Sequence, residues 1–230
     1  MYRLITAVCL FISIMGCSTT TKIAGSNYEF TTKTPTIIEE SLVSGLQVRL
    51  VRLSGGTTPC VSGTTDHIEL NGPIGPDSTY IVSKYLEMAQ KCYDANGKWF
   101  VNDVYLNSTG GLLADGIKLG KLFRKNQMHT MLSGDQRCAS SCAVAFLGGK
   151  FRQMQDEAEL IFHAPYKQGS YRQENCLSGT QSQFLKSYYV EMVGREIGNT
   201  LFDRTMSYCG SNQGWVINSG AARAYGIVTD

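Results

Sequence analysis

Short segments of alternating apolar and polar residues recur along the chain and predict half-buried strands. The clearest covers residues 45–53, and a shorter one covers residues 67–70. Residues 99–106, 128–132 and 158–162 are also strand-like, with apolar residues in alternation or in short runs. We therefore expect a sheet built from short strands.

Between these strands, apolar residues recur three or four positions apart, which predicts helices. The predicted helices cover residues 77–93, 111–123, 141–147, 181–206 as one or two helices, and 219–224. Asp77 or Ser78 is placed to cap the first helix. The repeated order of strand, crossover helix and strand indicates an α/β fold. We expect a mostly parallel sheet flanked by helices, with a site at the C-terminal ends of the strands.

The first 16 residues differ in pattern from the rest of the chain. Arg3 is the only charged residue among the first 21, and the apolar run over residues 4–15 suits a signal peptide but is short for a membrane span. Gly16 before Cys17 resembles the lipobox of bacterial lipoproteins, in which the Cys is lipidated and becomes an anchor. An ordinary secretory signal with an incidental Cys is the alternative. Either signal directs the protein out of the cytoplasm.

The lipobox resemblance implies a lipid-anchored protein of the bacterial cell envelope, on the periplasmic side of the outer or inner membrane. Residues 1–16 are then the signal peptide. Residues 17–40 are rich in Thr and Ser and lack apolar periodicity, so we expect a flexible tether. Residues 41–230 have the length of one α/β domain. The formal net charge is +2 and no Lys/Arg cluster stands out, which argues against a nucleic-acid partner.

Six cysteines remain after the predicted anchor, an even number in an oxidising compartment. They are Cys60, Cys92, Cys138, Cys142, Cys176 and Cys209. Two or three disulfides are expected, with the pairing left open. Metal binding is the competing interpretation, but the sequence has no Cys-x-x-Cys motif, and His67 and His129 lie away from the cysteines in the sequence. We expect no metal and no cofactor.

Three motifs carry candidate chemistry. Asn107-Ser-Thr-Gly-Gly111 follows a strand, and its glycines leave backbone N–H groups open to a ligand. Cys138-Ala-Ser-Ser-Cys142 places a Ser among small residues at the start of a helix. His163 ends the strand over residues 158–162 and is a candidate base. The order of a Gly pair, a Ser and a His predicts an acyl-transfer site.

These motifs resemble the ClpP/crotonase superfamily, and more closely the extracytoplasmic ClpP-like serine proteases of bacteria, over residues 67–228. The resemblance implies a ClpP/crotonase-like ββα spiral and a hydrolase acting on peptides or proteins. Ser140 is the implied nucleophile, with Ser141 as the alternative, and His163 is the implied base. The N–H groups of Gly111 and Ser141 are the implied oxyanion hole. Thr109 stands where the family has Pro.

The third member of the triad departs from the family pattern. The family places an Asp before the last helix, but the ungapped register puts Tyr208 there. Asp203 requires a shift along the chain, and Asn212 is the alternative that could orient the imidazole. A Ser/His dyad and an impaired enzyme therefore both stay open. The segment over residues 164–183 is unlike the oligomer-forming handle of the peptidase, so a stacked ring is not implied, and a homo-oligomer is left open.

Three functions follow from this sequence. The first is a lipid-anchored serine peptidase of the cell envelope. The second is a catalytically impaired lipoprotein that keeps the fold as a binding or interaction module. The third is a crotonase-type enzyme acting on acyl thioesters, which is disfavoured because coenzyme A is not expected outside the cytoplasm. Cys138 or Cys142 could instead be a thiol nucleophile, but we expect both to be in disulfides.

Overall fold

The computed structural model describes residues 19–21, 30–32, 35–54, 64–93, 96–97, 99–100, 102–167, 176–177, 182–209 and 214–229. The predicted signal peptide, Cys17, Cys60 and Asn212 lie outside these residues. Two three-residue strands, β1 (Thr19–Thr21) and β2 (Phe30–Thr32), pair antiparallel in the segment that we expected to be a tether.

A mixed six-stranded sheet forms the centre of the fold. In spatial order its strands are β11 (Phe151–Met154), β9 (His129–Leu132), β8 (Asp103–Asn107), β5 (Thr64–Asn71), β4 (Leu46–Ser54) and β3 (Thr36–Val43). The four strands from β11 to β5 are parallel, whereas β4 and β3 are antiparallel to their neighbours. The sheet is thus mostly parallel, as expected, but partly antiparallel. Its edge strand begins at Thr36, so residues 36–40 of the expected tether belong to the sheet.

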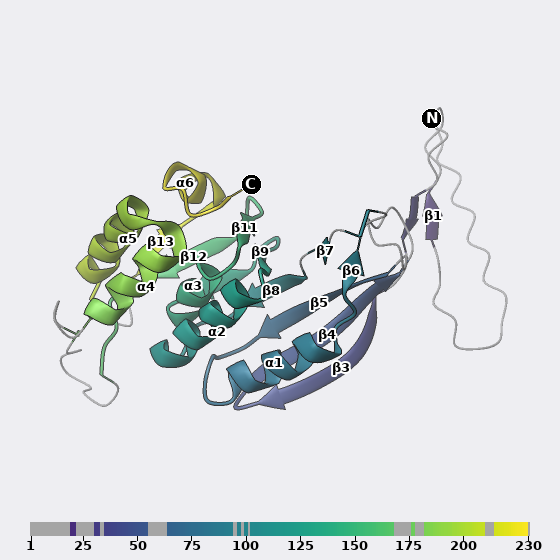
Figure 1. Ribbon diagram of the computed structural model, residues 1–230. Helices are drawn as coiled ribbons and strands as arrows, with labels where there is room; N and C mark the ends of the chain where they lie inside the picture. The colour runs from purple at the N-terminus through teal and green to yellow at the C-terminus, as the bar shows by residue number, and fades with distance from the viewer. Residues whose placement is uncertain are drawn as a thin grey trace.

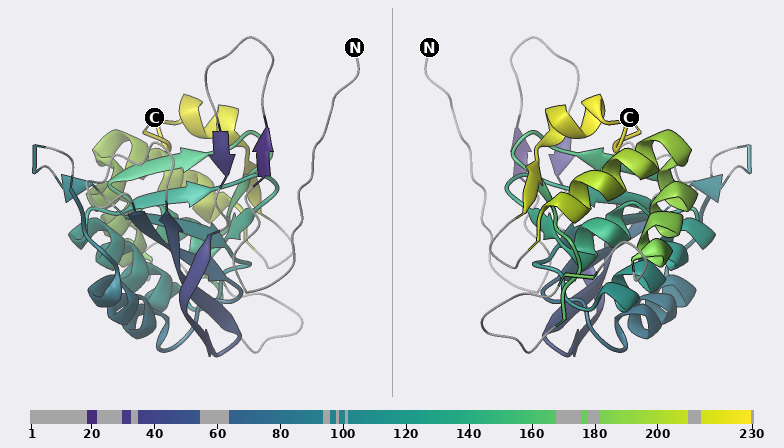
Figure 2. Two further views of the ribbon diagram at one scale, coloured as in Figure 1. Left: turned by 90° about the vertical axis from the view of Figure 1, so that its right-hand side faces the viewer. Right: turned by 90° about the vertical axis from the view of Figure 1, so that its left-hand side faces the viewer.

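Helices α1 (Ser78–Met88), α2 (Leu113–Lys125) and α3 (Ser141–Phe146) lie together on one side of this sheet (Figures 1 and 2). Strand residues such as Leu46, Val48 and Leu50 are fully buried beneath them. Helix α1 ends earlier than predicted, because Ala89 is extended and the chain then forms β6 (Cys92–Tyr93), which pairs with β7 (Trp99–Phe100). In the described part of the chain, the opposite face of the sheet carries no helix (Figure 1).

A second sheet continues the first and brings the candidate motifs together. Its strands are β10 (Arg137–Ala139), β12 (Glu159–Phe162) and β13 (Trp215–Ile217), with β10 and β12 parallel. Ser108, just beyond β8, is joined to this sheet, since its N–H donates to the Arg137 carbonyl at 2.8 Å and its carbonyl accepts from the Ala139 N–H at 2.9 Å. The remaining helices are α4 (Gln183–Val193), α5 (Arg195–Ser207) and α6 (Ser219–Ala224).

Disulfides confirm the expected cysteine chemistry in part. Cys138 is bonded to Cys142, and Cys176 is bonded to Cys209. Cys92 is also disulfide-bonded. These bonds are consistent with an extracytoplasmic location. Within the residues that the structure describes, no helix has the length and apolar character that crossing a membrane requires.

Candidate active site

Ser140 occupies the turn between β10 and α3 in a strained conformation. Its φ of 55° and ψ of −122° are unusual for a residue with a side chain, and such backbone costs of order 1–3 kcal/mol. The turn is held because the Ser140 N–H donates to the Ile161 carbonyl at 2.8 Å, and its carbonyl accepts from the Val144 N–H at 3.1 Å. The Cys138–Cys142 disulfide closes the same turn. The side chain of Ser140 lines a cleft of about 900 Å³.

His163 lines the same cleft and is held by its own segment of chain. It follows β12, whose Ile161 is in register with Ala139 of β10, so both candidate residues leave neighbouring parallel strands at one edge. The Nδ1 atom of His163 lies 3.0 Å from the carbonyl oxygen of Ala164. A proton on Nδ1 donates to that carbonyl and leaves Nε2 as an acceptor, which is the tautomer that a base requires. The ring also lies 5.6 Å, between centroids, from that of Tyr166.

The described residues show no hydrogen bond between the side chains of Ser140 and His163. Catalytic hydrogen bonds are often long before substrate binds, so this geometry is compatible with a pair that closes in the complex. No Asp or Glu in the described part of the chain forms a hydrogen bond or ion pair with His163. The imidazole is therefore oriented by a main-chain carbonyl rather than by a carboxylate.

The Gly pair, Gly110 and Gly111, allows the loop that follows β8 to pass close to Ser140. Gly110 and Gly111 have φ values of +94° and +149°, which favour Gly. The loop is fixed because the Ile74 N–H donates to the Gly110 carbonyl at 2.8 Å and the Ile74 carbonyl accepts from the Leu112 N–H at 2.9 Å. A Cβ on Gly110 would lie 2.7 Å from the Ser140 Cβ, and one on Gly111 would overlap the Ile74 carbonyl. A side chain at either position would require the neighbouring backbone to shift.

The N–H groups of Gly111 and Ser141 have no hydrogen-bond acceptor among the described residues. They are close together, because a Cβ on Gly110 would lie only 3.1 Å from the Ser141 nitrogen. Ser141 is also the first residue of α3, so its N–H lacks an intrahelical partner. The pair can donate to one anionic oxygen beside Ser140.

A disulfide-tied clamp holds the segment that follows His163. The Ala164 N–H donates to the Tyr208 carbonyl at 2.8 Å, and the Leu177 N–H donates to the Pro165 carbonyl at 2.8 Å. Cys176, beside Leu177, is bonded to Cys209, beside Tyr208. Tyr208, which the resemblance puts at the third triad position, therefore lies next to the segment that carries His163, and its contact there is made by its main-chain carbonyl.

Asp203, the first choice for the third member, is exposed on α5 and does not line the cleft. The buried positions of this helix are Gly198, Leu201, Phe202 and Thr205, which form the opposite face. Asn212 lies outside the described residues, so that alternative stays a prediction.

The sequence did not indicate the walls of the cleft. Its apolar side chains come from several elements: Leu112, Leu113, Val144, Phe162, Leu185, Tyr189 and Val216. Arg137 adds a cation, paired with Glu159 at 2.7 Å across β10 and β12. Burial raises the pKa of Tyr189, so its phenol stays neutral. The described residues contain no cluster of His, Cys, Asp and Glu arranged to hold a metal ion.

Comparison with protein-family models and with curated proteins finds no match for this chain. Among solved structures, the chain is similar to a serine-to-alanine variant of 1510-N, a membrane-bound stomatin-specific protease, with a TM-score of 0.55 and 11% sequence identity. The match covers 70% of this chain and 75% of the other. This chain shares that protease's fold. At such low identity the likeness shows the fold alone, and it supports the expected ClpP-like architecture.

Proposed function

We propose that this chain is a ClpP-like serine peptidase of the bacterial cell envelope that acts on peptides or proteins. The observation that carries the proposal is that Ser140, His163 and Gly111 line one cleft, and that the N–H groups of Gly111 and Ser141 have no acceptor in the described structure. The fold shared with a protease and the disulfides support it.

In the first half of the reaction, the Oγ of Ser140 attacks the carbonyl carbon of the scissile bond. Its proton passes to Nε2 of His163 as the new C–O bond forms. The carbonyl oxygen becomes an anion and accepts hydrogen bonds from the N–H groups of Gly111 and Ser141, and loss of one such donor typically costs about 2.7–4 kcal/mol. His163 then gives the proton to the leaving amine as the C–N bond breaks.

In the second half, His163 takes a proton from water, and the resulting hydroxide attacks the acyl-Ser140 ester. The tetrahedral intermediate accepts hydrogen bonds from the same two N–H donors and collapses to release a carboxylic acid, which then loses its proton to the solvent. The proton returns to Ser140. In this mechanism the Ala164 carbonyl does part of what a triad carboxylate does elsewhere, since it fixes the tautomer of His163.

The proposal includes an anchor: lipid attached to Cys17 would hold the domain at the periplasmic side of the outer or inner membrane. The apolar run before Cys17 supports this, and intact-mass analysis of the membrane fraction tests it. A Cys17→Ala variant released from the membrane fraction is the expected result. Wild-type partitioning of that variant would contradict the anchor.

One observation favours a second candidate, a binding or interaction lipoprotein without turnover. No described carboxylate contacts His163, and such a group normally stabilises the imidazolium that forms during acyl transfer. The two candidates differ in whether Ser140 becomes acylated.

A burst experiment with p-nitrophenyl acetate separates them. Wild-type protein should release about one equivalent of p-nitrophenolate per chain before the slower steady state, because the acyl-enzyme accumulates. The Ser140→Ala variant should show no burst. A matched Ser187→Ala variant, which changes an exposed serine on α4, should behave like wild type.

A burst of the same size in the Ser140→Ala variant would refute the assignment of the nucleophile. If the burst persisted in Ser140→Ala but disappeared in Ser141→Ala, Ser141 would be the nucleophile. Absence of any burst in wild type, together with no hydrolysis of labelled casein, would favour the binding module.

A further inference from the structure

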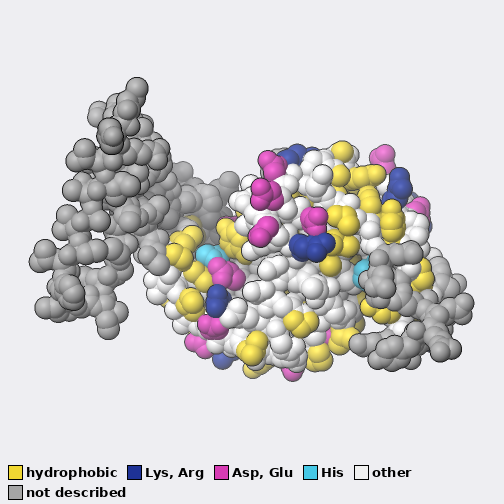
Figure 3. Space-filling view, turned by 180° about the vertical axis from the view of Figure 1, so that it is seen from behind, with side chains coloured by type: hydrophobic (Ala, Val, Ile, Leu, Met, Phe, Trp, Pro, Cys, Tyr) yellow, Lys and Arg dark blue, Asp and Glu magenta, His cyan; other side chains and the backbone are white. Residues whose placement is uncertain are grey.

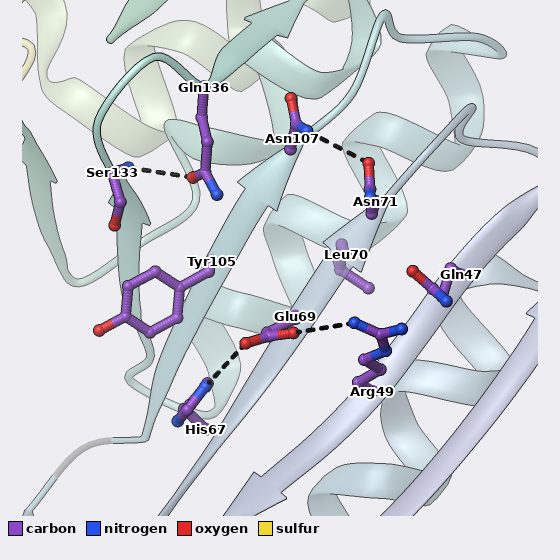
Figure 4. Close-up of a pocket in the computed structure, with 10 residues that line it drawn as sticks. All are labelled: Gln47, Arg49, His67, Glu69, Leu70, Asn71, Tyr105, Asn107, Ser133 and Gln136. Carbon is purple, nitrogen blue, oxygen red and sulfur yellow. Dashed lines mark hydrogen bonds and ion pairs between the residues drawn. The ribbon is translucent and has the colours of Figure 1, made fainter. Parts of the chain in front are cut away.

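A second cavity, of about 330 Å³, lies on the helix-free face of the six-stranded sheet (Figure 4). It shares no lining residue with the cleft that contains Ser140. Its volume is near the lower end of the roughly 300–1,000 Å³ typical of small-molecule sites. Seen from behind, the molecule carries interspersed acidic, basic and scattered hydrophobic side chains on this face rather than one continuous apolar patch (Figure 3).

The strand register builds the cavity from two rows of polar side chains. Arg49 of β4, Glu69 of β5 and Tyr105 of β8 are in register across three strands. In the next row, Gln47, Asn71 and Asn107 are in register in the same way. Neighbouring strands are about 4.8 Å apart, so each row is a continuous surface on one face.

Charges at this cavity are matched within the protein. Arg49 pairs with Glu40 at 3.4 Å and with Glu69 at 4.0 Å, and Glu69 also lies 3.2 Å from the Nε2 atom of His67. Of the described residues that line the cavity, Arg49 is the one Lys or Arg. An anionic ligand would therefore meet a cation that already has carboxylate partners. A neutral polar ligand suits this balance better.

Amides supply most of the remaining polar groups. Asn71 and Asn107 are joined by a 3.2 Å hydrogen bond, and the side-chain oxygen of Gln136 accepts from the Ser133 N–H at 3.0 Å (Figure 4). Each primary amide offers two donors and an acceptor, so these groups retain capacity for a ligand. Vicinal hydroxyls, which both donate and accept, match such a lining.

Tyr105 provides an aromatic surface beside these amides. Its ring is half-buried and is held edge-on by His67, with centroids 5.0 Å apart. Desolvation, together with the charges of Asp103 and Glu69, raises the pKa of the phenol, so its hydroxyl stays protonated as a donor. A ligand with one apolar and one hydroxylated face suits this arrangement: the aromatic ring can contact the apolar face, and the polar groups can bind the hydroxyls.

We propose that this cavity binds a neutral saccharide of one or two rings, separately from the acyl-transfer site. Tyr105 contacts the apolar face of the sugar ring, and the amides of Gln47, Asn71 and Gln136 bind its hydroxyls. Binding of this kind would hold the domain at a glycan, whether or not Ser140 is a nucleophile.

Titration of the full chain with maltose and with N,N′-diacetylchitobiose, followed by calorimetry, tests the proposal. We expect saturable binding of at least one sugar by wild type and unchanged affinity in Ser140→Ala. Tyr105→Ala should weaken binding by about tenfold or more, because the stacking surface is lost. The matched variant Tyr80→Ala, which removes an exposed tyrosine on α1, should bind like wild type.

If Tyr105→Ala does not fold, the double variant Gln47→Ala/Gln136→Ala replaces it, with the same weakening expected. Absence of saturable binding to both sugars would overturn the proposal, as would wild-type affinity in a folded Tyr105→Ala or double variant. Saturable binding of inorganic phosphate that Arg49→Gln abolishes would also overturn it, because the cavity would then be an anion site.

Discussion

The Cys138–Cys142 disulfide should hold Ser140 in its strained turn, and removing it gives a quantitative test. Both cysteines are fully buried, so the double variant Cys138→Ala/Cys142→Ala changes little at the surface. The bridge spans a sequence separation of 4, for which the loop-closure entropy is about 2 kcal/mol. This is comparable with the roughly 1–3 kcal/mol of strain in a backbone such as that of Ser140. The turn can therefore relax without unfolding the domain.

We expect the double variant to lose about 2 kcal/mol in the free energy of unfolding, measured with urea. The second-order rate of labelling by a fluorophosphonate should fall by more than the increase in unfolded protein can explain. A displacement of about 1 Å at a reacting group can cost about 100-fold in rate, so we expect a decrease of about 10–100-fold in protein that is still folded.

The matched control is Val82→Ala, which truncates a fully buried side chain in α1. Its expected cost is also about 2 kcal/mol. If Ser140 depends on the disulfide for its geometry, the control loses stability but keeps the wild-type labelling rate. A wild-type rate in the folded double-cysteine variant, or equal slowing in both variants, would show that the geometry of Ser140 does not depend on the disulfide.

Three further outcomes follow from the site and its surroundings. Gly111→Ala should slow fluorophosphonate labelling by about 100-fold or more, because its φ of +149° is strained for Ala and one oxyanion donor moves; wild-type labelling would contradict its role. Cys176 and Cys209 are 33 positions apart, and replacing both by Ala should lower the free energy of unfolding in urea by about 4 kcal/mol. Fluorophosphonate labelling should also be slower under conditions where the variant is folded. An unchanged labelling rate would contradict the clamp. Burial raises the pKa values of Tyr188 and Tyr189 in the folded protein. Above about pH 10 these tyrosines ionise in the unfolded chain but stay neutral in the folded one. The free energy of unfolding should therefore fall above pH 10, by up to about 3 kcal/mol per pH unit for the two. Urea unfolding at pH 9 and 11 should show this loss, and the loss should be smaller in Tyr188→Phe. A loss of the same size in that variant would contradict the role of Tyr188.

Several of the longer elements could be predicted from sequence because each carries its own periodicity. The eight-residue edge strand β3 was missed, because no side chain in it is fully buried. The strand predicted over residues 45–53 is β4, and the helix predicted over residues 219–224 is α6. Strands β10, β11 and β13 were not predicted. The first two lack the apolar runs that mark the similarly short β9 and β12, and β13 is apolar but has only three residues. In β11 the polar side chain of Arg152 is buried, where it bonds to the carbonyls of Ile227 and Gly149, so no apolar alternation marks the strand.

The candidate site likewise combines features that local sequence patterns mark with features that they do not. That Ser140, His163 and Gly111 line one cleft could be predicted, because each sits in a short motif next to a strand and parallel strands bring their C-terminal ends to one edge. Their catalytic roles stay a prediction. The main-chain contact of Ala164 with Tyr208 carries no sequence signal, because any residue except Pro can donate it. The polar cavity on the other face depends on the register of three strands, which local patterns do not specify.

Tandem mass spectrometry of the fluorophosphonate-treated full chain tests whether Ser140 is an activated nucleophile. We predict one adduct per chain, on the peptide that contains Ser140. The rate of adduct formation should fall strongly in His163→Gln. An adduct on another residue, or no adduct in wild-type protein with its disulfides intact, would contradict this role of Ser140.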